Sequence, residues 1–94
     1  MDKNIIIYVL SDSIGETGEQ VARAAISQFN PEKYEIRRFP YITDEDQIIE
    51  VLEEAKNERS VIIYTIVIEK LRNYLIENGK NFNIPVVDLM TPAL

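Results

Sequence analysis

The sequence predicts a three-layer α/β fold in which helices cover both faces of a four-stranded parallel sheet. Short apolar runs alternate with segments whose apolar residues recur at helical spacing, in the order βαβαβαβ. Consecutive parallel strands need a crossover connection, and a helix in a right-handed βαβ unit is the usual one. The chain length of 94 residues fits a single domain over 1–94.

The first strand and the first helix are the most clearly marked elements. The apolar run from Ile5 to Leu10 predicts a buried strand over residues 4–10. The following pattern predicts a helix over 16–29 that Asn30-Pro31 ends. Its expected buried stripe is made of small and apolar residues: Gly18, Val21, Ala22, Ala25, Ile26 and Phe29.

The second strand and helix are more polar. Residues 34–39 alternate between two faces, with Tyr34, Ile36 and Arg38 on one face and Glu35, Arg37 and Phe39 on the other. The two arginines favour an edge strand, where charge prevents pairing between sheets. Thr43 is the expected cap of the next helix, whose buried stripe is Ile48, Val51, Leu52 and Ala55.

The last two strands complete the alternation. Val61 to Thr65 is continuously apolar, which predicts a strand buried on both faces. The third helix is striped by Ile68, Leu71 and Leu75, and Gly79 is expected to end it. Residues 85–89 predict the fourth strand, within which Asp88 is expected to pair with a basic side chain.

The apolarity of the strands also predicts their order. The first and third strands are apolar on both faces and belong at the centre, whereas the second belongs at an edge. This gives the order 2-1-3-4, with the topological switch point between the first and third strands. The turns at Ser11–Thr17 and Thr65–Val67 should then flank one crevice.

The composition excludes several kinds of chemistry. The chain has no Cys and no His, so disulfides, thiolate nucleophiles, Cys/His zinc sites and histidine acid–base catalysis are ruled out. Its net charge of −6 argues against nucleic acid and against an anionic membrane as partners. No apolar run reaches the length of a membrane span, and no signal-peptide pattern opens the chain, so we expect it to be cytoplasmic.

The turn between the first strand and the first helix is the principal candidate site. Open α/β sheets usually bind their ligands there, beside the exposed amides of a helix N-terminus. The hydroxyl groups and amides of this turn could hold a phosphate or another anion, although the carboxylates of Asp12 and Glu16 would repel it. The candidate ligand-binding residues are Ser11, Asp12, Ser13, Gly15, Glu16 and Thr17, together with Thr65 from the neighbouring turn.

Structural roles compete with binding at the same positions. Ser13 and Glu16 have the spacing of a capping box, with Ser13 as N-cap and Glu16 at the third helical position. Asp12 could be a metal ligand or a general base, but a turn-forming carboxylate is the favoured interpretation. Thr65 is more typical of a helix cap than of a ligand contact. Three tyrosines are expected in the core or at its rim: Tyr8, Tyr41 and Tyr64.

Several segments together resemble one bacterial and plant family. The stretch from Tyr8 to Thr17, with its S-D-S-x-G-E-T turn, and the helix ending in Ser27-Gln28-Phe29 are similar to the start of the regulatory proteins for pyruvate, phosphate dikinase and phosphoenolpyruvate synthase. The resemblance continues through three shorter segments and so spans the chain: Arg38 to Tyr41, Tyr64-Thr65 and Val87 to Met90.

The resemblance implies a bifunctional parent enzyme. Such proteins use ADP to phosphorylate a threonine of the dikinase, and they remove that phosphate in a phosphate-dependent reaction that releases pyrophosphate. Family members are longer, and their P-loop lies in a C-terminal kinase-like domain. No G-x-x-x-x-G-K-[ST] motif occurs here. The resemblance therefore implies an N-terminal domain cut near Leu94, and we expect it to have no catalytic residues, cofactor or metal of its own. Its expected role is assembly, target recognition or anion binding. Assembly could take the form of a homodimer.

A stand-alone flavodoxin-like module for a phosphate-containing ligand is the alternative. Ile14 to Thr17 faintly resembles the turn that holds a flavin phosphate, but no aromatic-rich loop follows the third strand. A receiver-type domain is less favoured, because it would need paired acidic residues after the first strand, where Asp12 stands alone.

Overall fold

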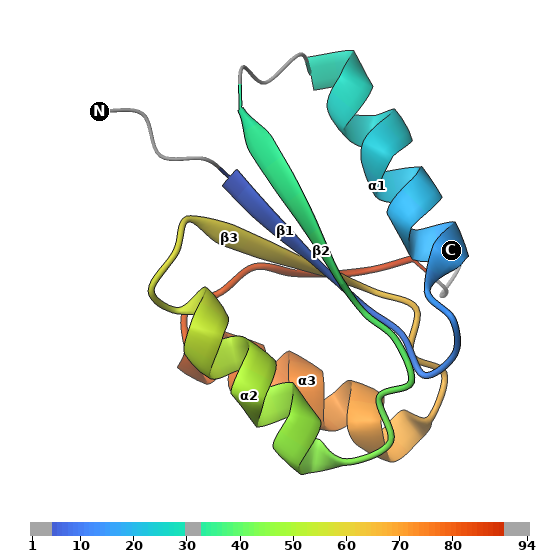
Figure 1. The fold of residues 1–94 in the computed structure, drawn as a ribbon. Helices are drawn as coiled ribbons and strands as arrows, with labels where there is room; N and C mark the ends of the chain where they lie inside the picture. Colours follow the sequence, from blue (N-terminus) through green and yellow to red (C-terminus); the bar gives the residue numbers. More distant parts are fainter. Residues whose placement is uncertain (1–4, 30–32, 90–94) are drawn as a thin grey trace, which may run out of the picture.

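The alternation of strands and helices that the sequence predicts is present in the computed structural model, which describes residues 5–29 and 33–89 (Figure 1). The elements in chain order are β1 Ile5–Leu10, α1 Glu16–Phe29, β2 Tyr34–Phe39, α2 Glu45–Ala55, β3 Ser60–Tyr64, α3 Glu69–Asn81 and β4 Val86–Asp88. Most bounds fall within a residue or two of the prediction. The expected helix stop at Asn30-Pro31 and the expected cut near Leu94 lie outside the described residues.

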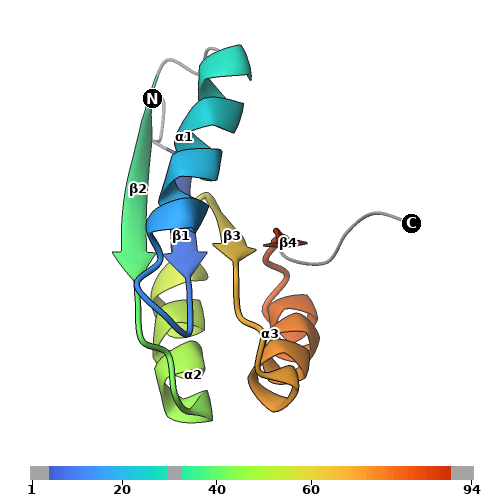
Figure 2. The same ribbon diagram turned by 90° about the vertical axis from the view of Figure 1, so that its right-hand side faces the viewer.

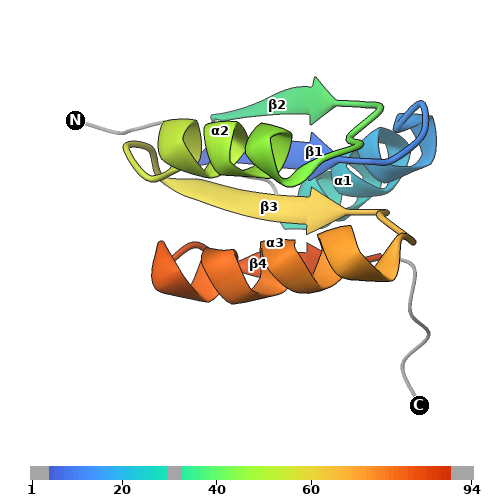
Figure 3. The same ribbon diagram turned by 90° about the horizontal axis from the view of Figure 1, so that it is seen from below.

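The four strands are all parallel and lie in the order β2-β1-β3-β4, which confirms the predicted topology. Figure 2 shows β1, β2 and β3 pointing the same way, so that the loops leaving them meet at one edge of the sheet. The helix α1 covers one face, and α2 and α3 cover the other, side by side (Figure 3). This edge, the carboxyl edge, is where the predicted site lies.

The two faces of the sheet have hydrophobic clusters of unequal size. Alternate β1 residues point to opposite faces, so Tyr8 and Leu10 join the large cluster beneath α2 and α3. Ile7 and Val9 join a small cluster with Ala22 of α1. The face that carries two helices therefore contributes most of the hydrophobic stabilisation.

The buried stripe of α1 is narrower than the sequence predicts. Gly18 and Ala22 are buried and Ile26 is half-buried, but Ala25 is exposed and Val21 is 42% exposed. In the described part of the chain no second helix lies beside α1 on this face, so only the residues that point directly at the sheet lose contact with water. The predicted burial of Phe29 falls on a side chain that the structure does not describe.

The cap of α2 is Asp44, and the prediction of Thr43 is wrong. The Asp44 carboxylate accepts a hydrogen bond from the Gln47 amide at 2.9 Å, and the Gln47 side chain accepts one from the Asp44 amide at 3.1 Å. Thr43 supports this capping box from outside, because its amide donates to the same Gln47 oxygen at 2.7 Å.

Gly79 lies inside α3 and does not end it, contrary to the prediction. The helix continues to Asn81, and the chain reverses at Asn83, which has a φ of 61°. Gly79 is needed because β4 passes very close: a Cβ at this position would lie 2.4 Å from Val86 Cγ2. Ile68 precedes the helix and is 49% exposed, so it also falls outside the predicted stripe, whereas Leu71 and Leu75 are buried.

We expect Gly79→Ala to lower the free energy of unfolding by about 1–3 kcal/mol, because the new methyl group overpacks the contact with Val86. Urea unfolding measures this change. In a Val86→Ala background the cost of Gly79→Ala should shrink or reverse, since the space is then available and alanine favours a helix. Lys80→Ala, on the exposed side of the same turn, is the control and should change stability little. Equal costs in both backgrounds would contradict the close-approach explanation.

Candidate functional site at the carboxyl edge of the sheet

The two turns that the sequence places beside one crevice are joined by a carboxylate. Asp12 lies in the loop after β1, and its Oδ2 accepts hydrogen bonds from the amides of Val67 at 2.8 Å and Ile68 at 3.2 Å. These amides precede α3, where a helix leaves its first N–H groups without partners. The Thr65 amide adds a bond to the Leu10 carbonyl at 3.0 Å. The predicted proximity is confirmed, and the side chain that bridges the turns is Asp12.

The loop after β1 is also fastened to the loop after β2. The Tyr41 amide donates to the Ser13 carbonyl at 2.8 Å, and the Ile42 amide donates to the Ser11 carbonyl at 2.9 Å. Ser11 is completely buried, and its Oγ accepts a hydrogen bond from the Ser13 amide at 3.0 Å. Ser11 therefore shapes the turn from inside, where it is closed to solvent.

The predicted capping box at the start of α1 is wrong. The helix begins at Glu16, and the Glu19 amide donates to the carbonyl of Gly15 at 3.2 Å, so Gly15 holds the position before the helix. Ser13 lies two residues earlier, and its Oγ is 3.1 Å from Ser11 Oγ. Gly15 has a φ of +82°, a conformation that glycine adopts without a steric cost.

The remaining candidate residues differ in exposure. Ser13, Glu16 and Thr17 are exposed, whereas Thr65 is half-buried and its methyl group lies near Gly18 of α1. Thr65 does not cap α3, because the N-cap position belongs to Ile68. Of the candidate residues that carry a hydroxyl group, Ser13 and Thr17 are therefore exposed, Thr65 is half-buried and Ser11 is buried.

The electrostatics of the edge are dominated by acidic side chains. Asp12 places its negative charge on the amides ahead of α3, which is where a bound anion would otherwise be stabilised. Acidic residues also open α1, α2 and α3. Among residues 5–29 and 33–89 no group of three or more side chains could hold a metal ion. The polar groups described at this edge therefore join the loops after β1, β2 and β3 to one another.

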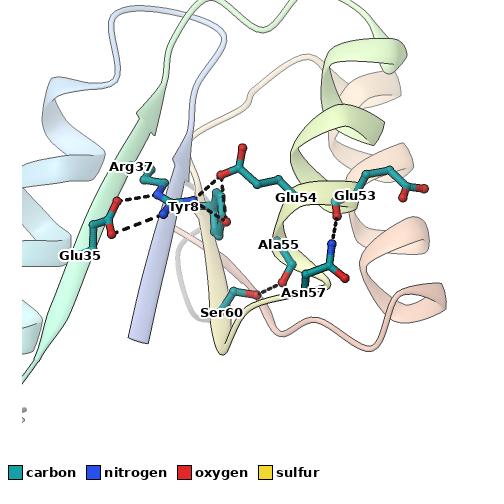
Figure 4. Close-up of polar contacts among 8 residues, drawn as sticks. All are labelled: Tyr8, Glu35, Arg37, Glu53, Glu54, Ala55, Asn57 and Ser60. Carbon is teal, nitrogen blue, oxygen red and sulfur yellow. Dashed lines mark hydrogen bonds and ion pairs between the residues drawn. The ribbon is translucent and has the colours of Figure 1, made fainter. Parts of the chain in front are cut away.

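A second polar cluster lies on the α2 face and was not predicted from the sequence (Figure 4). The buried Tyr8 hydroxyl donates to Glu54 Oε2 of α2 at 3.1 Å. Arg37 bonds the same hydroxyl at 3.2 Å, Glu54 at 2.5 Å and Glu35 at 2.6 Å, and its guanidinium lies 5.7 Å from the centre of the Tyr8 ring. The cluster thus ties the edge strand β2 to α2 across the central strand.

Burial raises the pKa of two tyrosines in the sheet. The pKa of Tyr8 rises to about 12, first because of desolvation and then because of the bond to Glu54. Desolvation, followed by the charge of Asp88, also raises the pKa of Tyr64. Both tyrosines belong to the core, as predicted, whereas Tyr41 is 61% exposed. Asp88 is one cause of the raised pKa of Tyr64, and its pairing with a basic side chain stays a prediction.

A signal for the Tyr8 cluster was present in the strand pattern. The alternation in β2 places Arg37 and Glu35 on the face opposite Arg38, and Tyr8 pairs with Arg37 in the parallel register. Arg38 accordingly turns the other way and reaches Glu19 of α1 at 3.1 Å. The Tyr8–Arg37 pairing could not be predicted because the sequence alone does not give the register between β1 and β2.

We expect Asp12→Ala to destabilise the chain by about 1–2 kcal/mol, because the Val67 and Ile68 amides lose their acceptor. Chemical denaturation gives the magnitude, and amide hydrogen exchange at the start of α3 should accelerate. Asp46→Ala, at another exposed helix start, provides the control. A full-size loss in the control, or unchanged exchange in α3, would argue against the bridge.

Stability should fall at alkaline pH through Tyr8. Since the pKa of Tyr8 is about 12 in the folded protein and 10.0 in its unperturbed form, the unfolded chain loses its proton first as pH rises. The contribution is complete below pH 10 and disappears between about pH 10 and 12. We expect Tyr8→Phe to reduce this alkaline loss in urea titrations, whereas Tyr41→Phe leaves it unchanged. An identical alkaline slope in Tyr8→Phe would refute the assignment.

Comparison with known proteins agrees with the resemblance in the sequence. The family model described as kinase/pyrophosphorylase matches residues 7–94. Relatives in Alkaliphilus oremlandii and Alkaliphilus metalliredigens are 64% and 58% identical over 91 and 93 residues, covering 97% and 99% of this chain. A Desulfitobacterium hafniense relative is 47% identical over 89 residues, or 95% of the chain.

All three relatives carry the name "Putative pyruvate, phosphate dikinase regulatory protein". The matched region is 33%, 34% and 33% of their respective lengths, so the chain spans about a third of the curated relatives it matches. None of the helices within the described ranges combines the length and apolar character that a membrane span needs. The match over residues 7–94 shows that the chain belongs to the kinase/pyrophosphorylase family.

Proposed function

We propose that this chain is the N-terminal domain of a cytoplasmic regulatory protein that acts on pyruvate, phosphate dikinase or phosphoenolpyruvate synthase. The observation that carries the proposal is the family match over residues 7–94, together with the name of relatives up to 64% identical. The parent would transfer a phosphoryl group from ADP to a threonine of its target, leaving AMP. In the reverse direction it would transfer that group to inorganic phosphate and release pyrophosphate.

Within that parent we assign this domain to assembly or target recognition. Phosphoryl transfer depends on a nucleotide cradle and on groups that hold Mg²⁺. The sequence contains no P-loop motif, and the acidic carboxyl edge of the sheet opposes the binding of ADP. The phosphoryl-transfer residues, with ADP and phosphate as ligands, therefore belong to the part of the parent beyond this chain.

Anion binding at the β1–α1 loop is a second candidate role. It is supported by the exposure of Ser13 and Thr17 next to the first turn of α1, and it is opposed by the neighbouring Asp12 and Glu16. The flavodoxin-like alternative shares the strand order but would require a bound flavin, which a visible absorption spectrum of the purified chain would reveal.

The activity test uses this chain joined to the remaining two thirds of the Alkaliphilus oremlandii relative. We expect the joined protein to phosphorylate the dikinase on threonine with ADP and to reverse the modification with phosphate, while the 94-residue chain alone does neither. Mass spectrometry of the dikinase and a pyrophosphate assay provide the readouts. Phosphorylation by the chain alone would contradict the division of labour, and an inactive but folded joined protein would contradict the assignment.

An NMR titration separates the two candidate roles of the domain. We expect phosphate, pyrophosphate and ADP at millimolar concentration to leave the amide shifts of Ser13, Gly15 and Thr17 unchanged, because Asp12 and the acidic helix starts repel anions. Localised, saturable shifts at these residues would instead establish an anion site. Sodium chloride at equal ionic strength is the control for general salt effects.

A further inference from the structure

Exposed apolar side chains gather at the carboxyl edge of the sheet. Four of the seven large apolar residues that are exposed in the described chain lie in the loops after β1, β2 and β3: Ile14 at 52%, Tyr41 at 61%, Val67 at 56% and Ile68 at 49%. We call these four residues the edge patch. Single exposed apolar residues are ordinary, but a group of them marks an interaction surface.

Hydrogen bonds hold the members of the edge patch together. Tyr41 donates its amide to the carbonyl of Ser13, the neighbour of Ile14. Val67 and Ile68 donate their amides to Asp12, one residue before Ser13. The loops that carry the four apolar residues are therefore fixed to one another through Asp12-Ser13.

Tyr41 adds independent evidence that the edge patch is a built surface. Its φ is 58°, in a region that residues other than glycine seldom adopt and that costs of order 1 kcal/mol or more. This conformation comes with a bond from the Tyr41 amide to Ser13, yet the aromatic side chain remains 61% exposed. Strain of this kind persists at surfaces that bind, because the surrounding structure holds it in place.

The path of the chain indicates what covers the edge patch. The strand β4 runs parallel to β3, and the Leu89 amide bonds the Tyr64 carbonyl at the end of β3, so the chain leaves the sheet at this same carboxyl edge. The curated relatives are about three times as long as the region they share with this chain. In such a parent, the sequence that follows Leu89 therefore starts from the same edge of the sheet as the patch loops.

We propose that the edge patch is the docking surface for the part of the parent protein that follows residue 94. This inference rests on the proposed N-terminal position of the chain. Acidic residues open the three helices that follow the patch loops, among them Glu16, Asp44, Asp46 and Glu69. The occupying surface must therefore present an apolar centre with lysine or arginine at its rim.

The absence of cysteine from the sequence makes a direct test possible. Single cysteines are introduced by Ile14→Cys and Val67→Cys, both at exposed positions, and thiol labelling of the corresponding peptides is followed by mass spectrometry. We expect labelling in the joined protein to be slower by about tenfold or more than in the 94-residue chain. Tyr34→Cys, at the opposite end of β2 and 39% exposed in the chain, is the matched control and should react equally in both.

The outcomes are distinct from those of the activity test. Unchanged labelling at positions 14 and 67 in a joined protein that modifies the dikinase would overturn this inference and leave the proposed function standing. Slowed labelling in a joined protein without activity would support the inference alone. If the 94-residue chain dimerises in sedimentation experiments, and if its own labelling at 14 and 67 slows with concentration, the patch belongs to a second copy and the proposal is wrong.

Discussion

The carboxylate of Asp12 is the interaction on which the carboxyl edge of the sheet depends. A parallel sheet brings the starts of its crossover helices to one edge, and each start leaves amides that need acceptors. For α2 the solution is local, since Asp44 and Gln47 cap each other. For α3 the N-cap position is Ile68, whose side chain cannot accept, and Asp12, 56 positions earlier in the chain, bonds the Ile68 amide just ahead of the helix.

This long-range contact of Asp12 has a consequence for function. The switch point between β1 and β3 is where an open α/β sheet commonly binds an anionic ligand. Here the Asp12 carboxylate already accepts hydrogen bonds from the amides after β3, and Ser11 is buried. The loop therefore joins the strands, and its exposed surface includes the apolar Ile14 beside the polar Ser13, Glu16 and Thr17. This arrangement is the basis for proposing contact with protein over contact with nucleotide.

The sequence predicts the topology because the strand order depends on how apolar each strand is, and this property is local to each strand. The errors arise where a partner distant in sequence decides. In the sequence Gly79 is typical of a helix end, whereas the structure shows that a glycine is needed there because Val86 packs against it. Ser13 has the spacing of a cap, but in the structure it bonds Ser11. Tyr8 reads as a plain core residue because its partners, Arg37 and Glu54, come from two other elements. The anion role of the turn stays a prediction.

Charge explains why the proposed division of labour is physically reasonable. Phosphoryl transfer from ADP brings several negative charges into one site, and these need cations and basic side chains. In this chain Arg37 bonds Glu35 and Glu54, and Arg38 bonds Glu19, so both arginines of β2 already hold the fold together. The net charge of −6 repels an anionic nucleotide. In the proposed parent, the same acidic side chains would attract a basic surface toward the apolar edge patch. These charges are consistent with the proposal that phosphoryl transfer takes place in another part of the parent.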